Sequence, residues 1–235
     1  MPARPAKATA PARELARLGP LAQLRAGRLV RRLTQLALGL VLYGLTLALI
    51  IRAGLGNAAW DVLHQGIAEH TPLSIGEAVI VMSLVVLLAW IPLRELPGLG
   101  TIANSFLVGI SADVFLGIFS TPDSVTLRGA MMLAGVVLNG VATALYIGSQ
   151  FGPGPRDGLM TGLHRRTGVS IRVVRTCLEL SVVVAGFLLG GTFGIGTVVY
   201  TLAIGPLVQL MLPWAIVELP GARTPEPAAA EVAGS

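Results

Sequence analysis

The 235 residues include 54% hydrophobic and only 12% charged residues, and the formal net charge is +5. A soluble domain carries about 25% charged residues on average, so this composition excludes a protein whose surface faces mainly water. The basic residues lie in the N-terminal segment and in short stretches between apolar runs, which suits lipid headgroups better than nucleic acid. The composition therefore predicts an integral membrane protein with a lipid bilayer, and no nucleic acid, as its partner.

The two ends of the chain have the composition of disordered segments. Residues 1–31 are rich in Ala, Pro and Arg, and residues 218–235 contain prolines among Ala and Glu. Such segments cannot bury enough apolar surface to offset the entropy lost on ordering. We expect two disordered tails, and the arginines of the first place it in the cytoplasm.

Between these tails, long apolar runs alternate with short polar connections. A transmembrane helix needs about 20 mostly apolar residues. The sequence therefore predicts an all-α, polytopic helical membrane protein with six transmembrane helices. The predicted spans are Leu33–Ile51, Ile75–Leu93, Leu99–Phe119, Leu127–Ile147, Ile171–Leu189 and Ile195–Leu212.

Two connections are longer than the others and differ from them in pattern. They extend from Gly54 to His70, after the first span, and from Gly152 to Arg166, after the fourth. Each begins with glycine or proline and continues with apolar residues spaced as on one face of a helix. Both are too short to cross a membrane. We expect two half-helices that lie at the membrane interface or enter the membrane.

The two halves of the chain repeat each other without a gap. When the sequence is shifted by 96 positions, many Gly, Asp, Thr and Ser residues of the first half coincide with the same residue types in the second. Chance produces such matches easily among apolar residues but rarely among these types. The sequence therefore predicts an internal duplication, with units at residues 32–120 and 121–217. The matched pairs include Arg32 with Arg128, Gly56 with Gly152, Asp61 with Asp157, Gly66 with Gly162, Ser74 with Ser170, and Gly109 with Gly205.

Three spans per unit is an odd number, so the second unit would enter the membrane from the opposite side to the first. The arginines agree with this orientation, because the external connections would hold only Arg52 and Arg128. We expect two inverted three-helix repeats, each with one half-helix. Both termini of such a protein lie in the cytoplasm.

Asp61 and Asp157 each lie near the start of a half-helix. A carboxylate at this position can simply bind the free N–H groups of the first turn, which contributes about 0.5–2 kcal/mol. Alternatively, glycine-interrupted segments at matching positions of inverted repeats form substrate sites in transporters. Helix N-termini favour an anionic solute whereas aspartates favour a cation or a proton, so the charge of the ligand stays open.

The third and sixth spans each carry a stripe of small or polar residues at every fourth position. Small residues at this spacing let helices approach closely, which predicts a packing seam between the two repeats. An acidic group at membrane depth is costly, which makes it a candidate functional residue as well. The stripes consist of Thr101, Ser105, Gly109 and Asp113, and of Thr197, Thr201, Gly205 and Gln209.

Other polar side chains near the spans have simple structural explanations. Glu179 lies one turn after Arg175, where a pair at i and i+4 would neutralise both charges, although a coupling role is the alternative. Asp61 and His64 could share a helix face, but two ligands do not make a metal site. We therefore expect the three histidines, His64, His70 and His164, to be solvated.

No sequence motif indicates an enzyme. The chain has no nucleotide-binding loop, no zinc-protease helix and no serine nucleophile motif. Its single cysteine, Cys177, excludes an internal disulfide and a cysteine-based cofactor site. We therefore expect no enzymatic activity, no cofactor and no bound metal.

Two segments resemble a known group of bacterial membrane proteins. They are residues 54–66, which contain Trp-Asp-Val-Leu-His-Gln-Gly, and residues 94–101, which combine an arginine with Pro-Gly-Leu-Gly-Thr. Over about residues 32–213 the chain is similar to the YczE-like integral membrane proteins, relatives of the YitT-like group. This resemblance implies a helical protein of the bacterial plasma membrane and implies no particular activity.

Two functions fit these features. The first is a transporter of a small solute or ion, with its site between the repeats: Asp61 and Asp157 would line or cap the site, and Asp113, Gln209 and Glu179 would supply further binding or protonatable groups. The second is a non-transporting scaffold, assembly or sensor protein that acts through a second copy or a protein partner. A polar cavity at the centre of the bundle would favour the first function, and a dry, packed centre the second.

Several glycines are expected to position the half-helices or to allow close packing of the spans. They are Gly56, Gly66, Gly152, Gly162, Gly109 and Gly205.

Overall fold

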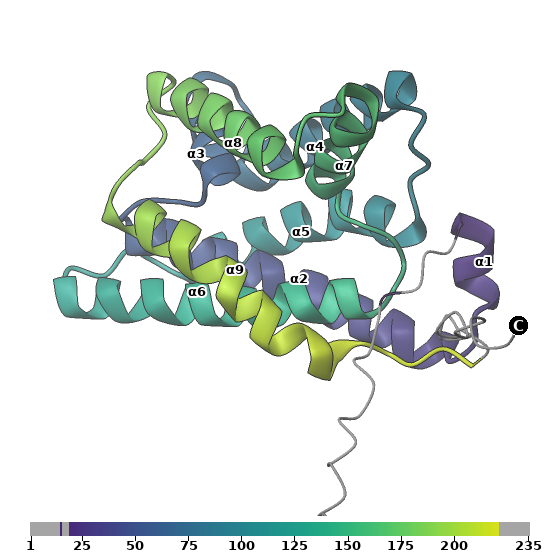
Figure 1. Cartoon of the computed structure of the whole chain (residues 1–235). Coiled ribbons are helices and arrows are strands. Elements are labelled where there is room, and N and C mark those ends of the chain that lie inside the picture. Colours follow the sequence, from purple (N-terminus) through teal and green to yellow (C-terminus); the bar gives the residue numbers. More distant parts are fainter. Residues whose placement is uncertain (1–14, 16–18, 221–235) are drawn as a thin grey trace, which may run out of the picture.

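The computed structural model describes Leu15 and residues 19–220, and this part of the chain forms nine helices and no strand (Figure 1). The prediction of an all-α protein is thereby confirmed. The helices are α1 (Pro20–Arg25), α2 (Leu29–Ala53), α3 (Ala59–His70), α4 (Ile75–Leu93), α5 (Leu99–Ile118), α6 (Val125–Gly148), α7 (Pro155–Thr167), α8 (Ile171–Leu188) and α9 (Ile195–Ala215).

Five helices of the described chain, α2, α4, α5, α6 and α9, are long and apolar enough to cross a membrane. The fifth predicted span forms helix α8, but its 18 residues include Arg172, Arg175 and Glu179, so it is less apolar than the others. That α8 crosses the membrane therefore stays a prediction. Helices α3 and α7 have 12 and 13 residues. At about 1.5 Å per residue they are too short for a hydrocarbon core of about 30 Å, as predicted.

Helix α1 lies inside the segment that was expected to be a disordered tail. It is tied to α2, because the buried guanidinium of Arg32 donates a hydrogen bond to the carbonyl of Gln23. A contact of this kind depends on the tertiary structure and cannot be read from composition. Of the predicted tails, residues 1–14, 16–18 and 221–235 lie outside the described residues.

Serine caps set the starts of three helices. The hydroxyl of Ser74 accepts a hydrogen bond from the backbone N–H of Glu77, whose carboxylate in turn accepts from the backbone N–H of Ser74. This reciprocal pair starts α4. The matched Ser170 caps α8, and Ser124 caps α6. The repeated serines of the sequence therefore mark repeated helix starts.

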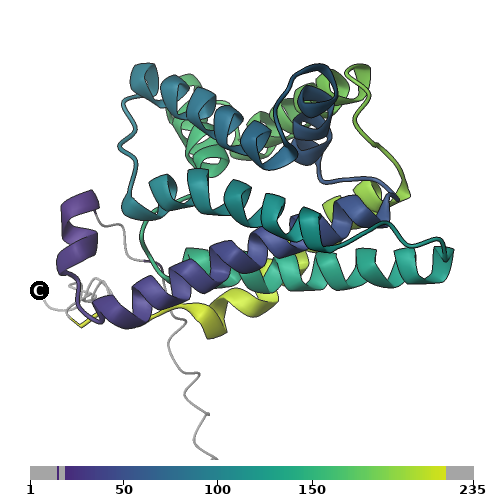
Figure 2. The same cartoon turned by 180° about the vertical axis from the view of Figure 1, so that it is seen from behind.

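The helices form two layers (Figures 1 and 2). Helices α2, α6 and α9 lie in one layer, α3, α4, α7 and α8 lie in the other, and α5 runs between them. The closest partners across the two halves are α2 and α6. A Cβ on Gly39 of α2 would strike the backbone of α6 near Tyr146, and one on the matched Gly135 of α6 would strike Ile50 of α2. The halves therefore meet where both central helices carry glycine.

The matched arginines make equivalent contacts in opposite directions. Arg32 of the first half donates to the carbonyls of Ser149 and Gln150, at the end of α6 in the second half, at 2.8 Å each. Arg128 of the second half donates at 2.6 and 2.7 Å to the last carbonyl of α2 and to the one after it. Each arginine thus supplies positive charge and donors to a helix C-terminus, where free carbonyls need them.

The loops that precede the two short helices also contact the opposite halves reciprocally. The carbonyl of Phe151, before α7, accepts from the N–H of Gly100 at the start of α5 at 2.8 Å. The carbonyl of the matched Leu55, before α3, accepts from the N–H of Gly196 at the start of α9, also at 2.8 Å. Each short helix is therefore anchored on a long helix of the other half.

The small-residue stripes do not form the seam between the halves. Gly109 of α5 packs against Gly76 of α4, within its own half, where a Cβ would strike backbone. The matched Gly205 of α9 has no atom within 4 Å of the position of a Cβ. Gly109 is a packing glycine as expected, whereas the expectation for Gly205 and for a seam between the repeats is wrong, because α2 and α6 fill that place.

Candidate functional site

A cavity of about 340 Å³ lies among the helices, between the N-terminal ends of α3 and α7. Long helices of both halves contribute to its wall, and so does α8. It is lined by the ionisable residues Arg156, Asp157, Arg175 and Glu179 and by the hydroxyl-bearing rings of Tyr43, Tyr146 and Tyr200.

Local chain geometry brings the two short helices to the cavity. Gly56 and Gly152 have backbone φ angles of +118° and +105°, which side chains rarely allow, so glycine is needed at both turns. Pro155 then occupies the first turn of α7, where its missing N–H costs nothing. These two glycines therefore allow the turns that lead into α3 and α7.

Gly66 and Gly162 lie on the faces by which the short helices pack onto other helices. A Cβ on Gly66 would strike the backbone of Gly186 in α8, and one on Gly162 would press against Leu93 at the end of α4. These glycines therefore fix how closely α3 approaches α8 and how closely α7 approaches α4.

Asp61 is buried next to the cavity without lining it, with 4% of its surface exposed. Its Oδ1 lies 3.1 Å from Nδ1 of His64 and 3.7 Å from Nη2 of Arg156. His64 is 1% exposed, so the expectation that it is solvated is wrong. Burial lowers the pKa of His64, despite the opposing effect of Asp61, which favours a neutral ring. Arg156 is therefore the cation that faces Asp61.

Asp157 differs from Asp61 although the two positions match in the repeat. Its carboxylate accepts a hydrogen bond from the hydroxyl of Tyr146 at 2.9 Å, and the residue is exposed to the cavity. Of the two matched aspartates, Asp157 is therefore accessible from the cavity and Asp61 is sealed off beside it.

Arg156 precedes Asp157 in α7, faces Asp61 and lies across from Trp60. Its guanidinium carbon is 5.0 Å from the centre of the Trp60 ring, and its side chain is 25% exposed. Trp60 and Arg156 occupy matched positions of the two halves, at the first turns of α3 and α7. Because the residue types differ, comparing the repeats could not indicate them, and the sequence analysis missed both as site residues.

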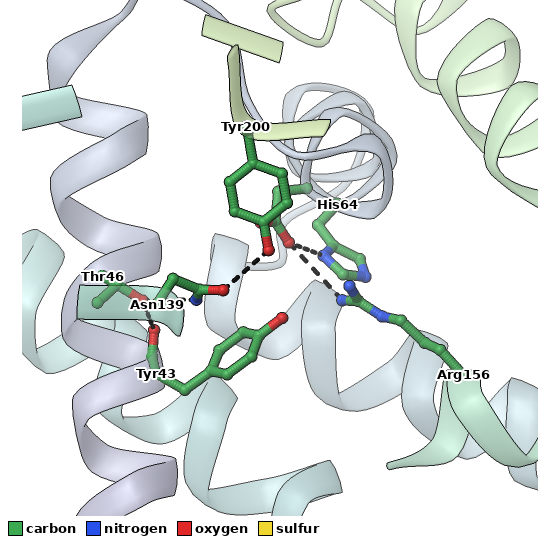
Figure 3. A network of polar contacts seen from close by, with 7 residues as sticks. Tyr43, Thr46, His64, Asn139, Arg156 and Tyr200 are labelled. Carbon is green, nitrogen blue, oxygen red and sulfur yellow. Dashed lines mark hydrogen bonds and ion pairs between the residues drawn. The ribbon is translucent and has the colours of Figure 1, made fainter. Parts of the chain in front are cut away.

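A chain of hydrogen bonds joins the cavity wall to the centre of the bundle (Figure 3). The hydroxyl of Tyr200 donates to Oδ1 of Asn139 at 2.9 Å, and the amide of Asn139 donates to Thr46 at 2.8 Å. The hydroxyl ends of Tyr43 and Tyr200 and the guanidinium of Arg156 point toward one another from three helices. The tyrosines, also missed in the sequence analysis, make this wall polar.

Glu179 and Gln209 line the cavity where it faces α8 and α9. Glu179 accepts a hydrogen bond from Arg175 at 2.8 Å, which confirms the predicted pair. Asp113, in contrast, lies outside the cavity. Its carboxylate accepts from the hydroxyl of Ser74 at 2.5 Å and from the N–H of Gly76 at 2.7 Å, so it joins α5 to the start of α4.

The two halves differ at this junction. The residues that match Gly76 and Asp113 are Arg172 and Gln209, which cannot make the same close contact between α8 and α9. Helices α4 and α5 pack along each other, whereas α8 and α9 do not pack to a comparable extent. The cavity is therefore closed beside α5 and less enclosed beside α9.

No three His, Cys, Asp or Glu side chains of the described chain lie close enough together to hold a metal ion. The charged groups at the cavity are instead the pair of Arg156 with Asp61, the carboxylate of Asp157, and a second ion pair of Arg175 with Glu179 on the wall. Such an arrangement can bind a charged or strongly polar small molecule.

Comparisons with known proteins agree with a membrane protein. The chain is 42% identical over 177 residues to an uncharacterized protein of Haemophilus influenzae, covering 75% of this chain and 81% of the relative. It is 31% identical over 192 residues to the uncharacterized membrane protein YczE of Bacillus subtilis, covering 80% and 88%. No solved structure matches it. The resemblance to YczE is thereby confirmed, and the chain is a multi-pass membrane protein.

A protein-family model matches residues 30–213, which include every helix that borders the cavity. The chain therefore belongs to the family described as a family of unknown function, DUF6198.

Proposed function

We propose that this protein is a transporter of a small solute or ion in the bacterial plasma membrane, and that the cavity between α3 and α7 is its substrate site. The observation that carries the proposal is a polar cavity with accessible charged side chains inside a bundle of apolar helices. Charged groups at membrane depth are costly and are kept mainly where they bind or conduct a polar species. A purely structural scaffold has no need of such a cavity.

The proposal includes two inverted repeats, with α8 as the sixth span and both termini in the cytoplasm. The reciprocal contacts of Arg32 and Arg128 support it, because each half holds the other by equivalent residues. In transporters of this kind the substrate site lies at the interface of the repeats, at broken or short helices. The cavity lies at such a place.

The difference between the halves supports alternating access. In the present conformation Asp113 holds α5 to α4, whereas α9 stands away from α8. An exchange in which α9 packs onto α8, through contacts other than that of Asp113 with Gly76, and α5 parts from α4 would close the cavity beside α9 and open it beside α5. Because the halves are inverted, that exchange would move the opening to the other side of the membrane.

The accessibility of one cysteine in the cavity tests this proposal without knowledge of the substrate. Thr143 lines the cavity, so Thr143→Cys is made in a Cys177→Ala background. A membrane-impermeant thiol reagent should label it from either side of oriented vesicles. Asp123→Cys, in an exposed loop, is the matched control and should be labelled from one side only. Labelling of Thr143→Cys from a single side, or from neither, would contradict transport and favour the scaffold.

A further inference from the structure

Two hydrogen-bond donors at the cavity have no acceptor. The guanidinium of Arg156 carries five N–H groups, yet it makes no hydrogen bond to any described residue, since Asp61 at 3.7 Å is too far away. The indole N–H of Trp60, also at the cavity, is buried without a partner in the described chain. A buried unpaired donor such as that of Trp60 is costly, and the partly exposed guanidinium of Arg156 is free to donate into the cavity, so a bound group that accepts hydrogen bonds is expected at this place.

The acceptor that suits these donors best is a carboxylate. A guanidinium presents parallel N–H groups that match the two oxygens of a planar anion. The N-termini of α3 and α7, which carry partial positive charge, lie at the same end of the cavity. Arg156 and Trp60 therefore form the part of the binding site that would hold a carboxylate.

The next residue in the chain, Asp157, offers a group of the opposite charge. One oxygen of Asp157 accepts from Tyr146, and the other has no partner among the described residues. The carboxylate is exposed to the cavity, unlike that of Asp61, which is engaged by His64 and Arg156. An ammonium group has three N–H donors, so it can bind the free oxygen of Asp157 and also face the ring of a neighbouring tyrosine.

The unpaired groups of the site are of both kinds, a carboxylate and N–H donors, so a ligand that carries one charge of each sign suits them best. Arg156 faces Asp61, and Arg175 pairs with Glu179. Asp157 remains, partly compensated by the N-terminus of its own helix, which is worth about half a charge. A simple cation would leave the donors of Arg156 and Trp60 unused, and a simple anion would leave Asp157 unpaired.

Size and lining narrow the choice further. A cavity of about 340 Å³ is at the lower end of small-molecule sites, which span roughly 300–1,000 Å³. Besides its charged and polar side chains, its wall includes the apolar side chains of Val108, Ile147, Met160, Ile204 and Val208. We infer that the cavity binds a small zwitterion of the amino-acid type, with a carboxylate at Arg156 and Trp60 and an ammonium at Asp157.

This inference rests on the proposed function for its role in transport, but binding alone tests it. The midpoint of thermal unfolding of the purified full-length protein is measured with a panel of zwitterions: glycine, serine, valine and β-alanine. Two analogues of valine each lack one charge: isobutylamine lacks the carboxylate, and isovalerate lacks the amine. At least one zwitterion should raise the midpoint in a concentration-dependent way, and neither analogue should do so at the same concentration.

Variants assign the two ends of the ligand. Arg156→Gln and Asp157→Asn should each weaken binding of the zwitterion by about tenfold to a hundredfold, because each removes a charge-assisted contact. Arg156→Lys keeps the charge and should retain part of the affinity. Asp123→Asn, far along the chain in an exposed loop, is the control and should bind as the unmodified protein does. The unfolding midpoint without ligand shows whether each variant is folded.

Three results would overturn the inference. Isobutylamine could bind as well as valine and lose affinity only in Asp157→Asn, which would show that the site prefers a cation. Isovalerate could bind as well as valine and lose affinity only in Arg156→Gln, which would show that the site prefers an anion. No zwitterion could shift the midpoint at all. In each case, labelling of Thr143→Cys from both sides would leave the proposed transport intact, whereas one-sided labelling with a zwitterion bound would contradict transport alone.

Discussion

Arg32 is fully buried in an apolar helix, and its guanidinium holds three backbone carbonyls. A charge in this position is tolerated because hydrogen bonds replace its lost hydration. Its flat face also lies 4.1 Å from the ring centre of Phe151, so the side chain packs as well as binds. The residue holds α1, α2 and the end of α6 together.

Replacing Arg32 with alanine should therefore lower the free energy of unfolding by about 2–4 kcal/mol, because buried carbonyls lose their donor. Denaturant unfolding of the purified protein measures this change. Arg31→Ala is the matched control, since Arg31 is the preceding residue of the same helix but is exposed. Equal effects of the two substitutions would show that the contacts of Arg32 contribute little.

At the scale of residues, the sequence identified those candidate positions that both repeats share. Asp61 and Asp157 could be located because their residue type recurs, and both lie at or beside the cavity. Trp60 and Arg156 occupy matched positions but are different residue types, so the same comparison did not identify them. Their importance follows from the approach of two helix ends, which only the tertiary structure defines.

At the scale of elements, the two halves use the same helices but pack them differently. Helix α4 begins at Ile75 and ends at Leu93, as predicted, because Ser74 caps its start and the chain turns into the left-handed region at Arg94. Helix α1 was missed because its six residues are too few to show a periodic pattern. The packing difference between α4–α5 and α8–α9 could not be predicted from helix bounds, which are alike in both halves.

The matched glycines of α5 and α9 provide a test of this difference. Gly109→Ala should lower the free energy of unfolding by about 1–3 kcal/mol, because the added Cβ would strike the backbone of Gly76 and the side chain of Ile80. Gly205→Ala has open space and should be neutral or stabilise α9 by up to about 1 kcal/mol, since alanine is the better helix former. Thermal or denaturant unfolding compares the two. Similar destabilisation by both substitutions would contradict the asymmetry.

At the scale of the whole molecule, two halves of the same sequence pattern hold each other through exchanged arginines, loops and central glycines. The match between the halves was visible in the sequence, because the matched polar residues keep one register throughout. The reciprocal contacts between the halves were not visible, since no spacing in the sequence shows whether the side chain of Arg32 contacts its own half or the other one. The cavity arises from these contacts, which bring the N-terminal ends of α3 and α7 to one place.

The account depends most on the opposite orientation of the two halves in the membrane. Single cysteines at Ser124 and at His164, each in a Cys177→Ala background, are labelled with an impermeant thiol reagent in intact cells and in inverted vesicles. We predict that Ser124→Cys is labelled from outside the cell and His164→Cys from the cytoplasmic side. Labelling of both cysteines from the same side would contradict the inverted repeat, and with it the site between two oppositely oriented halves.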